Sequence, residues 1–138
     1  MPGIKRLSHV CLRSKDLGKT LEFYQDVLGC TVIHEFRNQE EFLYGVFLLV
    51  EDGTFLEFFH QEEPITAGGP LRHICFEVED IQAFAKAMEE KGFHPEVKRG
   101  RTDRVLQCWV TDPDENLVEF HQYDQESVQY PYAKREAI

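Results

Sequence analysis

The residues of this chain that could do chemistry occur twice, at matching places in its two halves. The motif Ser-His9-Val-Cys in the first half returns as Arg-His73-Ile-Cys in the second. Glu57 follows His9 by 48 positions, and Glu119 follows His73 by 46 positions. Two imidazoles and two carboxylates form a donor set suited to a divalent transition metal. We therefore expect a metal whose ligands are His9, Glu57, His73 and Glu119.

The residues around these four side chains favour a metal over a purely structural role. Alternate residues of a β-strand lie on one face, so His9 should share a face with Cys11, and His73 with Cys75. Both glutamates stand among hydrophobic residues, where an unpaired carboxylate is costly to bury and a bound cation removes that cost. A core histidine bonded to a backbone carbonyl is the alternative for any single position. The twofold repetition favours the metal.

The elements that must position these residues follow the same order in both halves. Asp16 and Asp80 each stand seven residues after the motif histidine, at predicted helix N-caps, and Gly29 and Gly92 fit the helix ends. The β-prone runs of the first half cover residues 4–12, 31–36, 44–50 and 54–59. Those of the second half cover residues 73–78, 94–98, 105–111 and 117–123. The chain therefore predicts an α+β fold of two tandem βαβββ modules.

We expect residues 1–138 to form a single domain, because a chain of this length can fill one hydrophobic core but is short for two independent domains. Module one should cover about residues 4–61 and module two about residues 71–123. Residues 62–70 form a linker rich in Pro and Gly, which break regular elements. The tail, residues 124–138, is expected to be extended packing or a loose end.

Composition restricts the partners of this chain. The formal net charge of −10 and a pI near 5.0 argue against nucleic acid and anionic membranes, which attract clustered positive charge. A small molecule is the expected partner. Because no apolar run is long enough for a membrane span or resembles a signal peptide, we expect a cytoplasmic protein. The four cysteines, which lack close paired spacing, are expected to be reduced thiols packed in strands: Cys11, Cys30, Cys75 and Cys108.

Two segments of this chain resemble the vicinal oxygen chelate superfamily. Residues 17–29 resemble its first helix, and residues 111–119 resemble its closing turn and ligand strand. The superfamily includes lactoylglutathione lyase (glyoxalase I), methylmalonyl-CoA epimerase, fosfomycin resistance proteins and extradiol dioxygenases. The resemblance covers about residues 4–123 and implies a curved mixed sheet that encloses a cleft with a metal, usually in a homodimer. Glu115 stands where the family generally has glycine, and Asn116 is then the residue expected to tolerate a left-handed backbone.

Within this superfamily the chain most resembles glyoxalase I, which has the same His, Glu, His, Glu ligand set. The epimerases tend to carry glutamine at the Glu57 position, and the dioxygenases and fosfomycin enzymes resemble three-ligand sites. The resemblance implies a metal-dependent lyase or isomerase that stabilises an enediolate. Its reaction would convert the hemithioacetal of a 2-oxoaldehyde and a thiol into a 2-hydroxyacyl thioester. Glu119 would be the principal base and Glu57 its counterpart on the opposite face.

The expected substrate is a small anion, with a glutathione derivative as the first candidate. Arg13 matches a position where bacterial glyoxalases use arginine toward the glutathione carboxylate, and a solvated arginine at the strand end is the alternative. Gln61 is the second expected substrate-binding residue, although glyoxalase I tends to have asparagine there. The ligand set fits zinc, nickel, cobalt, manganese or ferrous iron equally well. One chain or two copies could complete the metal site with the same four residues.

Two other functions remain open on the sequence. Gln61 and the segment Leu71-Arg72 depart from the glyoxalase I pattern, which favours a metal-dependent epimerase or isomerase of another small anion. A non-catalytic binding or resistance module is the other alternative, with a pocket lined by Phe55, Phe59, Trp109 and Tyr123. Four histidines have no assigned role: His34, His60, His94 and His121. Of these, His121 shares the expected face of Glu119; we expect a satisfied structural histidine, and a side chain that supports the ligand Glu119 is the alternative.

Overall fold

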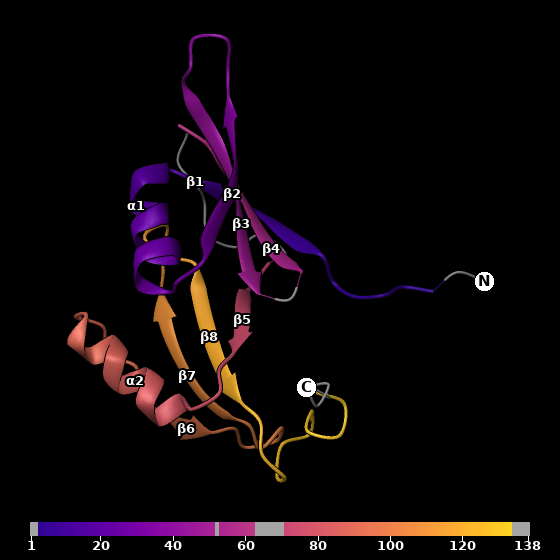
Figure 1. Ribbon diagram of the computed structural model, residues 1–138. Coiled ribbons are helices and arrows are strands. Elements are labelled where there is room, and N and C mark those ends of the chain that lie inside the picture. The colour runs from indigo at the N-terminus through magenta and orange to yellow at the C-terminus, as the bar shows by residue number, and fades with distance from the viewer. Residues whose placement is uncertain (1–2, 52, 63–70, 134–138) are drawn as a thin grey trace. The chain divides into compact units, whose positions relative to one another are not determined.

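The computed structural model describes residues 3–51, 53–62 and 71–133 (Figure 1). The chain divides into two compact units, residues 1–67 and 68–138, which we call module 1 and module 2. Each module is an α+β unit with its own four-stranded sheet. The predicted fold class and the βαβββ order are thus confirmed. The single domain and the enclosed cleft stay predictions.

Module 1 is built on a mixed sheet in which the first and last strands of the module are neighbours. Its sheet order is β1-β4-β3-β2, with β1 parallel to β4 and the other pairs antiparallel. Its elements are β1 (His9–Ser14), α1 (Leu17–Leu21), the π-helix η1 (Glu22–Val27), β2 (Thr31–Arg37), β3 (Leu43–Glu51) and β4 (Thr54–His60).

Module 2 repeats this arrangement. Its sheet order is β5-β8-β7-β6, again with one parallel pair, β5 and β8. Its elements are β5 (His73–Glu77), α2 (Ile81–Glu90), β6 (Lys98–Arg99), β7 (Leu106–Thr111) and β8 (Leu117–Gln122).

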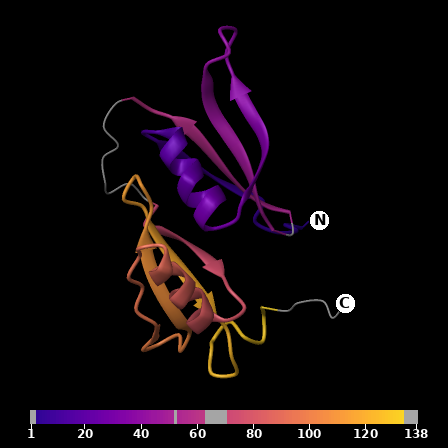
Figure 2. The same ribbon diagram turned by 60° about the vertical axis from the view of Figure 1, so that its left-hand side comes forward.

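In each module a helix covers one face of the sheet, and the core lies between them (Figure 2). In module 1 the Tyr24 ring packs 4.8 Å from that of Phe58, and both side chains are fully buried. In module 2 the Phe84 ring on α2 packs 4.4 Å from that of Phe120. Since alternate strand residues point to opposite faces, the residues between the core positions face away from the helix. These include both motif histidines and both glutamates.

The predicted caps of the helices are confirmed. Asp16 accepts a hydrogen bond from the Lys19 backbone at 3.2 Å, and Asp80 accepts one from the Ala83 backbone at 3.1 Å. Gly29 has a φ of 84°, a left-handed conformation that glycine adopts without strain. The first helix differs from expectation in one respect, because its second half is the π-helix η1.

Two strands are shorter than the sequence predicts. β1 begins at His9 rather than at residue 4. The ladder between β1 and β4 starts there, with the pair His9 and Phe55. The strand predicted over residues 94–98 is reduced to the two residues Lys98 and Arg99 of β6. Pro95 has no N–H to donate to a ladder, which disfavours pairing in this segment.

The turn before β8 also differs from expectation. Glu115, and not Asn116, adopts the left-handed backbone, with a φ of 65°. Asp112 organises the turn, since its carboxylate accepts hydrogen bonds from the backbone N–H groups of Asp114 and Asn116, both at 2.9 Å. The Asn116 side-chain amide donates to the same carboxylate at 2.8 Å. Asn116 is therefore used as a hydrogen-bond donor, and the strain falls on its neighbour.

The tail is anchored as far as the structure describes it. Asp124 accepts two hydrogen bonds from Arg99, at 3.0 and 2.7 Å, which tie the chain after β8 to β6. Ser127 is buried, and the Val128 backbone donates to the carbonyl of Asp103 at 2.9 Å. Residues 124–133 are thus a packed series of turns and not a loose end. The remainder of the predicted tail, residues 134–138, lies outside the described residues.

Candidate metal centre

The parallel strand pair of each module brings a histidine and a glutamate together. β1 lies beside β4, and Nε2 of His9 is 3.9 Å from Oε1 of Glu57. β5 lies beside β8, and Nε2 of His73 is 3.2 Å from Oε1 of Glu119. The structure therefore brings together the histidine and the glutamate predicted for each module. Their union into one four-ligand site stays a prediction.

The two pairs have similar surroundings. The Glu57 side chain is 17% exposed and that of Glu119 only 8%, whereas both histidines are more accessible. An aromatic residue of the third strand packs on each imidazole: Phe47 lies 5.4 Å from His9, and Trp109 lies 4.8 Å from His73. Each module thus presents a shielded carboxylate beside an imidazole with an accessible edge, an arrangement that suits a metal half-site.

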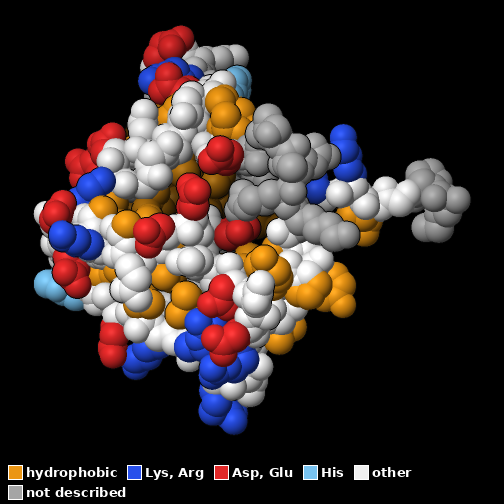
Figure 3. Space-filling view, turned by 60° about the horizontal axis from the view of Figure 1, so that its bottom comes forward, with side chains coloured by type: hydrophobic (Ala, Val, Ile, Leu, Met, Phe, Trp, Pro, Cys, Tyr) orange, Lys and Arg blue, Asp and Glu red, His pale blue; other side chains and the backbone are white. Residues whose placement is uncertain are grey.

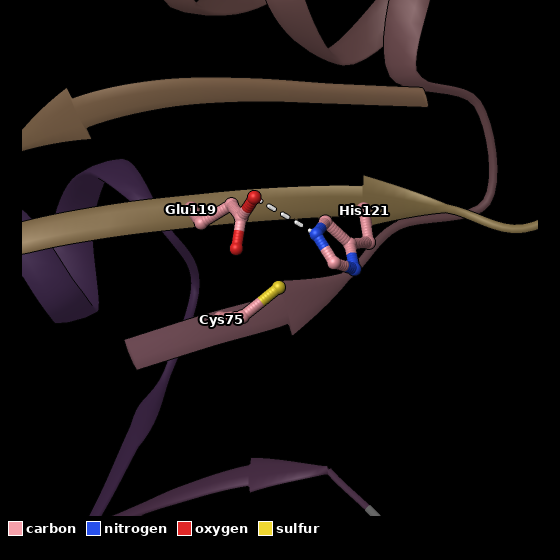
Figure 4. A group of neighbouring side chains, drawn as sticks. All are labelled: Cys75, Glu119 and His121. Atoms are coloured by element: carbon pink, nitrogen blue, oxygen red, sulfur yellow. Dashed lines mark ion pairs between the residues drawn. The ribbon is translucent and has the colours of Figure 1, made fainter. Parts of the chain in front are cut away.

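Two further donors lie around Glu119 in module 2. Cys75 lies opposite Glu119 in the β5–β8 register, and His121 is the next residue on the same face of β8 (Figure 4). Nε2 of His121 is 2.9 Å from Oε2 of Glu119. One donor atom from each of the three residues lies within 4.8 Å of the others. Glu119 therefore stands between His73 on one side and the Cys75–His121 pair on the other.

His121 corrects an expectation from the sequence. Its side chain is 8% exposed, and Nδ1 lies 3.4 Å from the Tyr123 hydroxyl. Nε2 has no hydrogen-bond partner among the described residues, because the contact with Glu119 is close but lacks hydrogen-bond geometry. A buried ring nitrogen without a partner is unusual for a structural histidine. His121 is thus not the satisfied core residue that was expected.

The donor chemistry of both modules fits a divalent transition metal. Each module offers an imidazole nitrogen and a carboxylate oxygen, and module 2 adds the buried Nε2 of His121, which has no hydrogen-bond partner among the described residues and lies 2.9 Å from Glu119. The sequence reasoning had placed Cys75 on the face of His73 and His121 on that of Glu119. It did not identify Cys75 and His121 as candidate metal donors, because the pairing of Cys75 with Glu119 depends on the register between β5 and β8, which local sequence patterns do not show.

All four cysteines are free, as expected. Desolvation, followed by the neighbouring Glu119 carboxylate, raises the pKa of the Cys75 thiol, although the residue as a whole is exposed. Desolvation and Glu57 likewise raise the pKa of Cys11. Burial raises the pKa of Cys108 to about 11. In the metal-free protein these groups are therefore thiols near neutral pH, which makes them poor nucleophiles.

The two expected substrate-binding residues contact each other. The Arg13 guanidinium donates a hydrogen bond to Oε1 of Gln61 at 3.0 Å. Arg13 shares its face of β1 with His9, and Gln61 follows directly after β4. The amide orients the guanidinium on the same face as the His9–Glu57 pair. This arrangement differs from a freely solvated arginine at the strand end.

Module 2 contains a pocket of about 450 Å³ on the same sheet face as Glu119. Gln107 and Trp109 of β7 form one wall, and they pair with His121 and Glu119 in the ladder. The other lining residues are His94, Glu96, Lys98, Arg99, Gly100 and Arg101. Of its three cationic groups, Lys98 is paired with Glu96 at 3.7 Å and Arg99 with Asp124 at 2.7 Å, so Arg101 is the group with which an anionic ligand would pair. His94, unassigned on the sequence, is thus a pocket residue.

Comparison with known proteins identifies the family. The sequence model of the Glyoxalase/Bleomycin resistance protein/Dioxygenase superfamily matches residues 6–120. The chain belongs to this superfamily. The predicted resemblance is thereby confirmed, and with it the expectation of a fold whose members typically bind a divalent metal.

Three superfamily members illustrate the range of similar proteins. The chain is 30% identical to lactoylglutathione lyase of Haemophilus influenzae over 83% of this chain and 90% of that protein. It is 33% identical to mitochondrial methylmalonyl-CoA epimerase of Mus musculus over 62% of this chain and 53% of that protein. The crystal structure of a glyoxalase family protein from Enterococcus faecalis has a TM-score of 0.70 and 25% identity, covering 85% of this chain and 97% of that one.

On the face shown in Figure 3, Lys and Arg side chains are interspersed with Asp and Glu side chains. Within the part of the chain that the structure describes, no helix is long and apolar enough to cross a membrane. Glyoxalase-family homologues bind small-molecule substrates.

Proposed function

We propose that this superfamily member is a divalent-metal-dependent lyase or isomerase that moves a proton next to a substrate carbonyl. Its metal ligands would be His9, Glu57, His73 and Glu119. The observation that carries this proposal is the repeated pair of imidazole and carboxylate on parallel strands, at 3.9 Å in module 1 and 3.2 Å in module 2. One chain or two copies would supply the two pairs, and we expect a cytoplasmic homodimer.

A divalent cation bound by these residues would supply a Lewis acid that stabilises negative charge on the substrate oxygen. Glu119 is our candidate for the base that takes the proton from one carbon and returns it to the next. Its carboxylate is 8% exposed and held between two imidazoles, His73 at 3.2 Å and His121 at 2.9 Å. Such contacts orient the carboxylate and exclude water from it. Glu57 would act as its counterpart on the opposite side of the substrate.

The substrate would be a small anion. Arg13, oriented by Gln61 at 3.0 Å, offers a planar guanidinium fork to a carboxylate. Arg101, in the pocket of module 2, offers a second place for negative charge. The similarity to lactoylglutathione lyase favours the hemithioacetal of a 2-oxoaldehyde and glutathione, with a 2-hydroxyacyl thioester as product.

An epimerase or isomerase of another small anion is the second candidate. Similarity to methylmalonyl-CoA epimerase favours it, as does Gln61 in place of the asparagine of the glyoxalase I pattern. Both candidates need a base beside an acidic carbon, so Glu119 would have the same role in each. They differ in what Arg13 and the pocket bind.

Activity measurements on metal-loaded protein test both candidates. Protein reconstituted separately with zinc, nickel, cobalt, manganese or ferrous iron is given methylglyoxal and glutathione, and thioester formation is followed by ultraviolet absorbance. Incorporation of solvent deuterium into small carboxylic acids and acyl thioesters tests the epimerase. A protein that binds no stoichiometric metal, or that binds metal and gives neither signal, would exclude the enzyme and leave a binding module.

A further inference from the structure

Two donors beside Glu119 have no part in the proposed four-ligand site. Cys75 lies opposite Glu119 on β5, and His121 follows it on the same face of β8. The three donor atoms lie within 4.8 Å of one another (Figure 4). His121 is 94% buried, and its Nε2 has no hydrogen-bond partner among the described residues although it lies 2.9 Å from Oε2 of Glu119. A bound cation would satisfy this nitrogen.

Module 1 provides an internal comparison, because it contains only part of this arrangement. Cys11 lies opposite Glu57 as Cys75 lies opposite Glu119. The position equivalent to His121, however, is Phe59, which offers no ligand atom. A thiol next to a carboxylate is therefore common to both modules, while the third donor belongs to module 2.

We propose that Cys75, Glu119 and His121 form a binding site for a thiophilic divalent cation, Zn²⁺ or Cd²⁺, within module 2. Sulfur, nitrogen and oxygen donors together are a typical set for such ions. Metal–ligand bonds of about 2.0–2.3 Å require donors about 3.5 Å apart, so side-chain adjustments of about an ångström bring the group to ligating geometry. Cys75 is exposed, which gives the ion a route in from solvent.

Binding would replace the Cys75 thiol proton, which leaves to solvent, with a metal–thiolate bond. Because Glu119 belongs both to this site and to the proposed catalytic residues, an ion held here would withdraw the carboxylate from proton transfer. The inference does not rest on the proposed activity. It requires only the three donors of module 2.

Cadmium titration of the full chain tests the site, since thiolate–cadmium bonds absorb in the ultraviolet. We expect a band that saturates at stoichiometric Cd²⁺ in the unmodified protein and is absent in Cys75→Ser. His121→Gln should weaken Cd²⁺ binding by at least about tenfold. Loss of a residue that only hydrogen-bonds a metal ligand already weakens metal affinity by this factor, and loss of a ligand should cost at least as much. Cys11→Ser is the matched control from module 1 and should keep the band.

A second measurement avoids reliance on the folding of variants. In the unmodified protein, the ¹¹³Cd NMR signal of the bound ion should have the chemical shift of a site with one sulfur ligand together with nitrogen and oxygen ligands, and not that of a site with nitrogen and oxygen ligands alone. The double variant His9→Gln, Glu57→Gln should keep the cadmium band even if the proposed activity is lost, which separates this inference from the proposed function. The inference is overturned if the band is missing in the unmodified protein, persists in Cys75→Ser, or depends on Cys11.

Discussion

Modules 1 and 2 share a backbone plan but differ in the side chains around the carboxylate that both contain. Both place a histidine and a cysteine on the first strand beside a glutamate on the last. Around Glu57, module 1 has an oriented guanidinium, Arg13, bonded to Gln61. Around Glu119, module 2 has a buried imidazole, His121, at 2.9 Å. The carboxylate of module 2 is also the more buried of the two, 8% against 17% exposed.

We interpret this difference as different roles of the two modules in the proposed site. In the function proposed above, the shared positions would supply metal donors, and they lie on the parallel strand pair that both modules contain. The positions that differ would bind substrate in module 1 and hold the carboxylate in module 2. If this interpretation is right, equivalent substitutions in the two modules will have unequal effects on function and equal effects on folding.

The largest functional effect should come from the two glutamates. We expect Glu119→Gln to lower kcat by about 10²–10⁴-fold, the usual contribution of a general base, and to exceed the effect of Glu57→Gln. The measurement is steady-state turnover of whichever substrate is active in the metal-loaded protein. Glu89→Gln, an exposed position on α2 with the same loss of charge, is the control and should leave turnover unchanged. A greater loss in Glu57→Gln would reverse the assignment.

The cores should respond equally in the two modules. Phe58 and Phe120 directly follow the two glutamates and are almost completely buried against the helix side of their sheets. We expect Phe58→Ala and Phe120→Ala each to lower the free energy of unfolding by about 3–5 kcal/mol, because each leaves a cavity. Denaturant unfolding followed by circular dichroism measures this. Tyr132→Ala, at a position that is 84% exposed, should change the free energy of unfolding little. If only one of the two phenylalanine substitutions were destabilising, the two cores would not be equivalent.

Substrate recognition should depend on module 1. We expect Arg13→Lys to raise KM by about tenfold with kcat nearly unchanged, since a point charge replaces a planar fork. Gln61→Ala should raise KM by a smaller factor, because Gln61 only orients the Arg13 guanidinium. Steady-state kinetics separate KM from kcat. Arg37→Lys, on β2 and paired with Glu35, is the charge-matched control; a loss confined to kcat in Arg13→Lys would argue against substrate binding.

The smallest effect concerns the anchored chain after β8. The hydrogen bonds and charge of Arg99 lower the pKa of Asp124 to about 2 from an ordinary value of 3.8. Because folding favours the ionised carboxylate, the pair stabilises the protein fully above about pH 4, and this contribution is lost as the pH falls toward about 2. Asp124→Asn should therefore lower the Tm by a few degrees at neutral pH, with a difference that disappears near pH 2 in thermal melts. A difference that grows on acidification would contradict this.

Local patterns in the sequence predicted much of what the structure contains. Asp16 and Asp80 cap helices where expected, because a side-chain cap depends on residues three positions apart. The α+β class and the strand order followed from the repeat. Two of the exceptions were local: Pro95 disfavours pairing in the segment before β6, and Glu115 took the left-handed position in place of Asn116.

For the candidate site, the sequence by itself determined the four repeated donors and the faces on which they lie. His9, Glu57, His73 and Glu119 are identified by repetition, a property that needs no coordinates. Only the tertiary structure decided which neighbours join them, because the β5–β8 register sets Cys75 opposite Glu119. It alone also showed that Nε2 of His121 is buried without a hydrogen-bond partner among the described residues. Strand register and burial arise from contacts between distant segments, which short-range sequence patterns do not encode.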